Sequence, residues 1–213
     1  SEQAIKDQLK ANTEEVVARG GFGSPTIFVG KTDMYFGNDR LPLVPVAINV
    51  SAKQLNDQRL IATVRESLQR HQLSAQWLEI EVTESCFITD LEQARQTLEK
   101  LRDEGLRIYL DDYGTGYSSL SHIKALPVYA LKIDRSFVRD IRNDNSDGMI
   151  VASTVTLARN LGLKVVAEGV ETREQLMHLK LMGCDEVQGF YLQRPVAAAQ
   201  LAPLLQKGWF DFT

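Results

Sequence analysis

The chain has 213 residues, with 24 lysines and arginines against 28 aspartates and glutamates, and its net charge is −4. This mild acidity, without a basic stripe, argues against a nucleic-acid polymer as partner, because such binding needs cations that displace phosphate counterions. No apolar run approaches the roughly 20 residues that span a bilayer, and the N-terminus lacks the apolar region of a signal peptide. The distant Cys86 and Cys184 form no CxxC or zinc pattern. We therefore expect a cytoplasmic protein with reduced thiols and no membrane insertion.

Short apolar runs of β-type composition alternate with helical periodicity from residue 46 onward. The expected strands are 46–50, 78–82, 107–111, 130–134, 164–168 and 186–190. The intervening apolar residues at helical spacing are Leu55, Leu60, Ile61, Val64 and Leu68, then Leu91, Ala94, Leu98 and Leu101. Thr172 and Gln175 have the spacing of a capping box, and glycines follow where helices should end, at Gly105, Gly162 and Gly183. This order predicts a parallel sheet with right-handed crossovers, either open or closed.

Polar residues stand at or near the end of each expected strand. They are Asn49, Glu81, Asp111, Lys132, Glu168 and Gln188. The C-terminal ends of parallel strands converge on one site when the sheet closes, whereas an open sheet would scatter them along an edge. The Gly114-Thr-Gly116 sequence also lacks the later glycine and the ribose-binding acid of a dinucleotide fold. The sequence therefore favours a barrel.

The third strand ends in two adjacent carboxylates, Asp111 and Asp112. They repel each other, and a buried unpaired carboxylate costs several kcal/mol, so a cation should lie between them. A metal ion is the natural candidate. Lys132 lies between Leu131 and Ile133 in an apolar strand, where an unpaired ammonium would also be unfavourable.

Six motifs in order carry a family resemblance. They are NVSAKQL at 49–55, EVTES at 81–85, LDDYGTGYSSL at 110–120, LKIDRSFV at 131–138, VVAEGVET at 165–172 and CDEVQGFYLQRP at 184–195. Over roughly residues 46–205 the chain resembles an EAL domain. The resemblance implies a modified (β/α)8 barrel of the TIM type and a phosphodiesterase that hydrolyses cyclic di-GMP to linear pGpG with Mg²⁺ or Mn²⁺. Such hard cations prefer oxygen ligands, and paired metals stabilise phosphoryl displacement.

The resemblance also implies roles for individual residues. The implied metal ligands are Asn49, Glu81, Asp111 and Asp112, and the implied catalytic residues are Lys132 and Glu168. Gln188, Asp134, Arg135 and Glu171 match residues that contact or support the substrate, and Glu84 matches the anchor of the loop 113–119. In the family this loop couples dimerisation to catalysis, which implies a homodimer. Purely structural roles remain as alternatives. Lys132 or Arg135 could form an ion pair, Glu171 could cap a helix, and Gln188 could be a strand residue whose polar group is hydrogen-bonded.

The N-terminus departs from the family pattern. The family begins with a strand that carries an E-x-L signature, and no E-x-L sequence precedes residue 46. Residues 10–43 resemble instead the C-terminal part of a DsbA-like 2-hydroxychromene-2-carboxylate isomerase, without its nucleophile-bearing half. We therefore expect a thioredoxin-fold-like fragment at 1–43, with a helix at 2–19 and strands at 26–30 and 34–37, followed by an N-terminally truncated EAL domain at 44–213. One of these strands could substitute for the missing one and close the barrel, or the segment could be a loose appendage or a swapped element of a dimer.

Three functions follow from these features. The first is a metal-dependent cyclic di-GMP phosphodiesterase, whose activity the loss of the E-x-L glutamate would weaken. The second is a non-catalytic cyclic di-GMP receptor or a degenerate interaction domain, which the same loss favours. The third is an oxidoreductase or isomerase fragment, which the absence of a CxxC motif disfavours.

Overall fold

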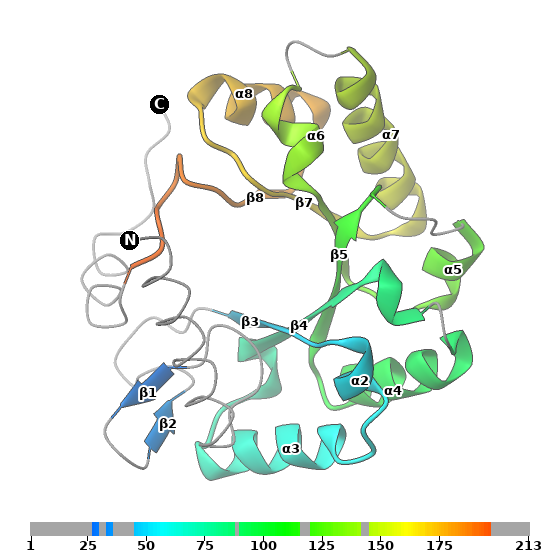
Figure 1. Ribbon diagram of the computed structural model, residues 1–213, viewed down its shortest axis with the longest axis vertical. Coiled ribbons are helices and arrows are strands. Elements are labelled where there is room, and N and C mark those ends of the chain that lie inside the picture. Colours follow the sequence, from blue (N-terminus) through cyan, green and yellow to red (C-terminus); the bar gives the residue numbers. More distant parts are fainter. Residues whose placement is uncertain are drawn as a thin grey trace, which may run out of the picture.

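A curled parallel sheet forms the centre of the computed structural model, which describes residues 27–29, 33–35, 45–87, 90–115, 120–141 and 145–196. Six parallel strands are hydrogen-bonded in chain order. They are β3 (Val46–Asn49), β4 (Leu78–Thr83), β5 (Arg107–Tyr113), β6 (Ala130–Ile133), β7 (Lys164–Ala167) and β8 (Glu186–Val187). The sheet curves like half of a barrel, with helices outside the curve (Figure 1). The predicted strand order and barrel-like α/β fold are confirmed.

Helices connect the strands and cover the outer face of the sheet. They are α2 (Ala52–Leu55), α3 (Leu60–Arg70), α4 (Leu91–Asp103), α5 (Leu120–Ala125), α6 (Arg135–Arg139), α7 (Asn145–Leu161) and α8 (Arg173–Met182), with 3-10 turns η1 (Ala75–Trp77) and η2 (Glu84–Phe87). The apolar period between Leu55 and Leu68 proves to span two helices. The chain turns after α2 because the Asp57 carboxylate accepts the Arg59 N–H at 2.9 Å. In the part of the chain described, no helix has the length and apolar character to cross a membrane.

Helix ends follow the expected signals. Thr172 and Gln175 form the predicted capping box at the start of α8, and Gly183 ends this helix with a left-handed φ of 82°. A second capping box, between Ser51 and Gln54, starts α2 and was not predicted. Both boxes satisfy N–H groups that a helix start leaves free.

The two faces of the sheet carry different residues, because strand side chains alternate. The helix-facing residues Ile80, Ile108, Leu110, Leu131 and Ile133 are at most 1% exposed and belong to the main hydrophobic core. The opposite face holds a small second cluster of Tyr109, Ala130 and Val166, with Tyr129 packed against it. The concave side of the sheet is therefore where the strand-end polar residues gather.

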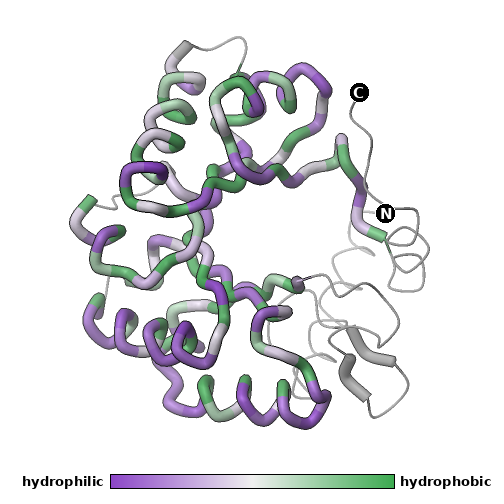
Figure 2. Tube along the Cα trace, turned by 180° about the vertical axis from the view of Figure 1, so that it is seen from behind, coloured by the Kyte–Doolittle hydropathy of each residue, from purple (hydrophilic) through white to green (hydrophobic). Residues whose placement is uncertain are grey.

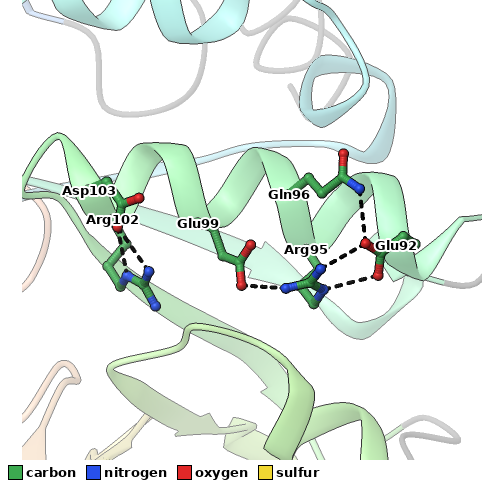
Figure 3. Close-up of polar contacts among 6 residues, drawn as sticks. All are labelled: Glu92, Arg95, Gln96, Glu99, Arg102 and Asp103. Atoms are coloured by element: carbon green, nitrogen blue, oxygen red, sulfur yellow. Dashed lines mark hydrogen bonds and ion pairs between the residues drawn. The ribbon is translucent and has the colours of Figure 1, made fainter.

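The outer surface of α4 is charged. Arg95 bridges Glu92 and Glu99, one helical turn away on either side, and Gln96 donates to Glu92 (Figure 3). The opposite side of α4 buries Ala94, Leu98 and Leu101. Figure 2 shows α4 as largely hydrophilic, whereas α7 is pale or hydrophobic over much of its length.

The N-terminal strands form a separate hairpin. β1 (Ile27–Val29) pairs antiparallel with β2 (Asp33–Tyr35), close to the two strands predicted there. Neither strand pairs with the six-stranded sheet within the described residues, where β3 is an edge of the sheet. The expected helix at 2–19 lies outside the described residues.

Candidate active site

Lys132 is the centre of a buried ionic cluster. Its Nζ lies 2.7 Å from Glu81 Oε1, 3.1 Å from Asp111 Oδ1 and 2.5 Å from Glu168 Oε1. The lysine comes from β6, while the carboxylates come from β4, β5 and the residue that follows β7. Four of the six strand-end residues predicted to converge therefore meet.

Burial makes this cluster electrostatically strong. The Lys132 side chain is 4% exposed, and the exposures of its three partners range from 11% to 20%. Burial alone would lower the pKa of Lys132, but hydrogen bonds to Glu168 and Glu81 outweigh it and hold the pKa above its usual value. Burial raises the pKa of Glu168, an effect that Lys132 only partly offsets. Lys132 is therefore cationic at neutral pH, with a carboxylate of raised proton affinity beside it.

Asp112 follows Asp111 in a left-handed conformation, with φ 55°. Its backbone N–H donates to Asp111 Oδ1 at 3.0 Å. Burial raises its pKa, and the negative charges of Asp111 and Asp134 raise it further. The doubled aspartate thus faces a third acid from the next strand–helix connection.

Asp134 caps the short helix α6, which begins directly after β6. Its carboxylate accepts the Ser136 N–H at 2.9 Å and also the Ser136 hydroxyl. Burial opposes ionisation of Asp134, but these hydrogen bonds outweigh it and lower its pKa. Arg135 is exposed, and its side chain packs so close to Gly169 that a Cβ there would lie 2.5 Å from Arg135 Cβ. The β7–α8 connection therefore needs glycine beside Arg135.

Glu84 lies at the start of η2, directly after β4. Its Oε1 accepts the backbone N–H of Gly114 at 3.5 Å, a long hydrogen bond. Glu84 therefore reaches the segment after β5, where the resemblance implies a loop anchor. Residues 116–119 of that loop lie outside the described residues.

The remaining predicted site residues lie at the rim. Asn49 is exposed, and its Cα is paired with that of Glu81 across β3 and β4. β8 ends at Val187, so Gln188 follows the strand instead of lying within it, and its side chain is exposed. Glu171 is also exposed, and its N–H donates to Gln175 within the cap of α8. The described contacts leave these three side chains outside the Lys132 cluster.

The donor set suits a divalent cation that binds oxygen. Glu81, Asp111 and Glu168 surround one ammonium, and Asp112 adds a fourth acid, so the cluster carries excess negative charge. Among the described residues, no three acidic, histidine or cysteine side chains already lie close enough together to hold a metal. Carboxylate oxygens are nevertheless the ligands that Mg²⁺, Mn²⁺ and Ca²⁺ prefer. The residues present fit such an ion by chemistry and by charge.

A family model supplies the deciding comparison, since the model for the EAL domain matches residues 33–195. The chain belongs to the EAL domain family. The resemblance of residues 10–43 to a thioredoxin-fold isomerase finds no support in this match, which begins within that segment.

Relatives of this EAL domain include proteins of cyclic di-GMP metabolism. The bifunctional diguanylate cyclase/cyclic di-GMP phosphodiesterase MucR of Pseudomonas aeruginosa is 46% identical over 156 residues, which cover 73% of this chain and 23% of MucR. This EAL domain thus spans less than a quarter of that relative.

Two solved structures have the same fold. The PaMucR phosphodiesterase in complex with c-di-GMP is 46% identical and superposes with a TM-score of 0.71, over 74% of this chain and 64% of that one. The manganese and cyclic-diGMP complex of Klebsiella pneumoniae BlrP1 is 37% identical, with a TM-score of 0.68 over 72% of this chain and 40% of that one. EAL structures thus include complexes with a divalent metal.

Two features near the site were not foreseen from the sequence. Tyr109 donates its hydroxyl to Glu79 Oε1 at 2.8 Å, on the concave face below the Lys132 cluster. Phe137 of α6 packs against the backbone of Gly114. The alternation of side chains along β4 and β5 could have indicated the contact between Tyr109 and Glu79. The contact between Phe137 and Gly114 depends on tertiary packing.

Proposed function

We propose that this EAL domain is a cyclic di-GMP phosphodiesterase that hydrolyses its substrate to linear pGpG with Mg²⁺ or Mn²⁺. The observation that carries the proposal is the buried Lys132, in contact with Glu81, Asp111 and Glu168 at adjacent strand ends. The name of MucR, a relative over 73% of the chain, supports the substrate class.

The proposed reaction is an in-line displacement at phosphorus. Water forms a new P–O bond while the bond from phosphorus to the 3′ oxygen breaks, and the leaving oxygen takes up a proton. Lys132 holds the attacking water, and Glu168, whose pKa is raised, accepts its proton. Asp111, Asp112, Glu81 and Asn49 would hold the divalent cation, which when bound neutralises phosphate charge and activates water. Asp134, Arg135, Gln188 and Glu171 would contact or support the substrate at the rim.

Incubation with cyclic di-GMP and Mn²⁺ or Mg²⁺, followed by chromatography for pGpG, tests this proposal. The parent chain should form pGpG, and Lys132→Ala and Asp111→Asn should form at least a hundredfold less. Lys164→Ala is the matched control, because Lys164 pairs with Asp185 outside the cluster. Absence of product from the parent would overturn the enzymatic proposal.

A non-catalytic cyclic di-GMP receptor is the second candidate. The edge position of β3 in the described sheet favours it, because no strand there supplies the E-x-L glutamate. Calorimetric binding of cyclic di-GMP without turnover would support the receptor, and absence of both binding and turnover would exclude both functions. A cytoplasmic location remains a prediction.

The proposed homodimer has a candidate surface on α7. Met149 and Ile150 are 69% and 36% exposed, and they line a pocket of about 490 Å³ together with Tyr113 and Gly114. A twofold interface brings a patch against its own copy, so an uncharged apolar patch is self-complementary. Met149→Glu should therefore shift the sedimentation mass from dimer to monomer, whereas Met177→Glu on α8 should not. A parent chain that sediments as a monomer would contradict this part of the proposal.

A further inference from the structure

The doubled aspartate poses a geometric problem that the pairing of β5 solves. Successive side chains of a regular strand point to opposite faces. Asp111 points to the concave face, where it contacts Lys132, and Leu110 is fully buried on the helix-facing side. In a regular strand Asp112 would therefore point into the hydrophobic core under the helices.

An extra residue in β5 prevents this. Leu110 is paired with Leu131 and Tyr113 with Ile133, with a register shift between the two pairs. Two residues of β5, Asp111 and Asp112, thus lie opposite Lys132 alone on β6. This is the arrangement of a β-bulge, and the left-handed φ of Asp112 is typical of its distorted backbone. Tyr113, after the bulge, again packs against the main core.

The bulge is held from one side by α6. Gly114 follows it with φ 98°, and a Cβ at this glycine would lie 2.9 Å from Phe137 Cε2 and 3.4 Å from Cζ. The edge of the Phe137 ring therefore fills the space directly beside the Gly114 backbone. Phe137 is itself partly buried against the core, which fixes the position of its ring.

Hydrogen bonds close the other side of the turn. The Thr115 hydroxyl donates to the Asp112 carbonyl oxygen at 2.8 Å, and the Thr115 N–H donates to the same oxygen at 3.3 Å. A non-glycine residue in the left-handed region is strained, and such strain persists only where the surroundings enforce it. The three heavy atoms nearest to a Cβ placed at Gly114 all belong to the Phe137 ring.

We infer that Phe137 is a positioning residue: its ring, packed against Gly114, holds the one-residue bulge of β5 that turns Asp112 to the same side of the sheet as Asp111. The effect of Phe137 on metal binding rests on the proposed function, because both carboxylates must reach the site to hold a divalent cation. The structural part of the inference, the dependence of the Asp112 backbone on Phe137, is independent of that function.

The test combines backbone NMR with metal binding on the whole chain. The Cα and Cβ chemical shifts of Asp112 report its backbone conformation without metal, and calorimetry with Mn²⁺ alone reports the metal site. In Phe137→Leu, the Asp112 shifts should move from left-handed toward extended values, and the Mn²⁺ dissociation constant should rise at least tenfold. Phe137→Met keeps most of the bulk of the side chain, so its Asp112 shifts and its Mn²⁺ dissociation constant should lie between those of Phe137→Leu and those of the parent. This variant replaces Phe137→Leu if Phe137→Leu does not fold.

A structural control separates positioning from general destabilisation. Leu161→Ala removes a partly buried side chain of α7 that packs on the same core. It should lower the melting temperature but leave the Asp112 shifts and the Mn²⁺ affinity of the folded protein unchanged. Equal effects of Phe137→Leu and Leu161→Ala on Mn²⁺ affinity would overturn the positioning role of Phe137.

The outcomes distinguish the inference from the proposed function. Unchanged Asp112 shifts in the Phe137 variants would overturn the inference, whatever the activity of the parent. Altered shifts with unchanged Mn²⁺ affinity would overturn the link from Phe137 to the metal site. If the parent binds no Mn²⁺, the metal dependence of the proposed function fails, and the shifts of Asp112 alone decide whether Phe137 holds the bulge.

Discussion

Lys132 Nζ lies 2.5 Å from Glu168 Oε1, and the two side chains are only 4% and 20% exposed. This contact joins β6 to the residue that follows β7. Glu81 and Asp111 approach the same ammonium from β4 and β5. Charges at such burial are weakly screened by water, so the lysine holds four neighbouring strand ends together in addition to any chemistry that it performs.

Replacement of Lys132 by methionine should destabilise the fold. The methionine keeps an unbranched side chain but leaves the carboxylates of Glu81, Asp111 and Glu168 without their cation. Loss of one partner from a buried ion pair typically costs about 3–5 kcal/mol, so we expect the free energy of unfolding at pH 7 to fall by roughly that amount. Urea denaturation with a chelator present measures it.

Lys164→Met is the matched control. The Lys164 ammonium lies 2.6 Å from Asp185 Oδ1, but its side chain is 49% exposed. Exposed pairs contribute about 1 kcal/mol or less, so this variant should lose far less stability. Equal losses for the two lysines would show that burial of the Lys132 cluster has no energetic consequence.

Gly189→Ala should be strongly destabilising. A Cβ at Gly189 would lie 2.1 Å from the Val170 carbonyl oxygen and 2.3 Å from the Val170 nitrogen, and backbone atoms cannot rotate away. The N–H of Val170 also donates to the Gln188 carbonyl oxygen at 3.0 Å, so the clash falls on a hydrogen-bonded junction. We expect a loss of about 3 kcal/mol or more, at the upper end of overpacking effects, in urea denaturation.

Gly162→Ala separates the clash from backbone strain. Gly162 has φ 73°, yet nothing lies within 4 Å of its added Cβ. Only the left-handed conformation is then penalised, at about 1–2 kcal/mol. The prediction for Gly189 fails if Gly189→Ala is as stable as Gly162→Ala or more stable.

The sequence was sufficient to predict the six strands and the residues at their ends. The strands are read from apolar runs, and parallel pairing places their C-terminal ends together, so Glu81, Asp111, Lys132 and Glu168 could be grouped without coordinates. Neither the prediction of the strands nor the grouping of their end residues needs detail of long-range packing. Both depend only on chain order and on the alternation of strand side chains.

Other features depended on packing that the sequence does not encode locally. The bulge at Asp112 is visible only as a shift in pairing between β5 and β6. β8 ends at Val187, so Gln188 follows the strand, although the strand expected from the sequence extended to Phe190. The hairpin of β1 and β2 matches local β-propensity, but its separation from the main sheet is a tertiary property.

Thr172→Ala tests the cap that starts α8. The Thr172 hydroxyl accepts the Gln175 N–H at 3.2 Å, while Gln175 Oε1 accepts the N–H groups of Thr172 and Glu171. Loss of an N-cap side chain typically costs about 1 kcal/mol, and we expect that decrease in the free energy of unfolding. Thr172→Ser retains the hydroxyl and should stay within about 0.5 kcal/mol of the parent in the same urea titration. A similar loss in both variants would indicate that the threonine methyl group, and not the cap, is responsible.

Asp185→Asn should reveal a pH-dependent contribution away from the catalytic cluster. Asp185 Oδ1 lies 2.6 Å from Lys164 Nζ, and Oδ2 accepts the Val165 N–H at 3.0 Å. Burial would raise the pKa of Asp185, but the hydrogen bonds from Lys164 and Val165 outweigh it, so the folded pKa lies below its usual value of 3.8. The folded protein therefore binds fewer protons at this residue than the unfolded chain does.

The sign of the pH dependence follows from that difference. The stabilisation from Asp185 is fully present above the unfolded pKa and is lost as pH falls through the folded pKa. Parent and Asp185→Asn should differ by about 1 kcal/mol or less between pH 5 and 7, because the pair is partly exposed, and the difference should begin to shrink as the pH falls below about 4. Urea denaturation from pH 3 to 7 measures both curves, with Asp103→Asn as a control whose pair with Arg102 is more exposed. A difference that grows as the pH falls would contradict the lowered pKa of Asp185, because the carboxylate would then have to favour protonation in the folded state.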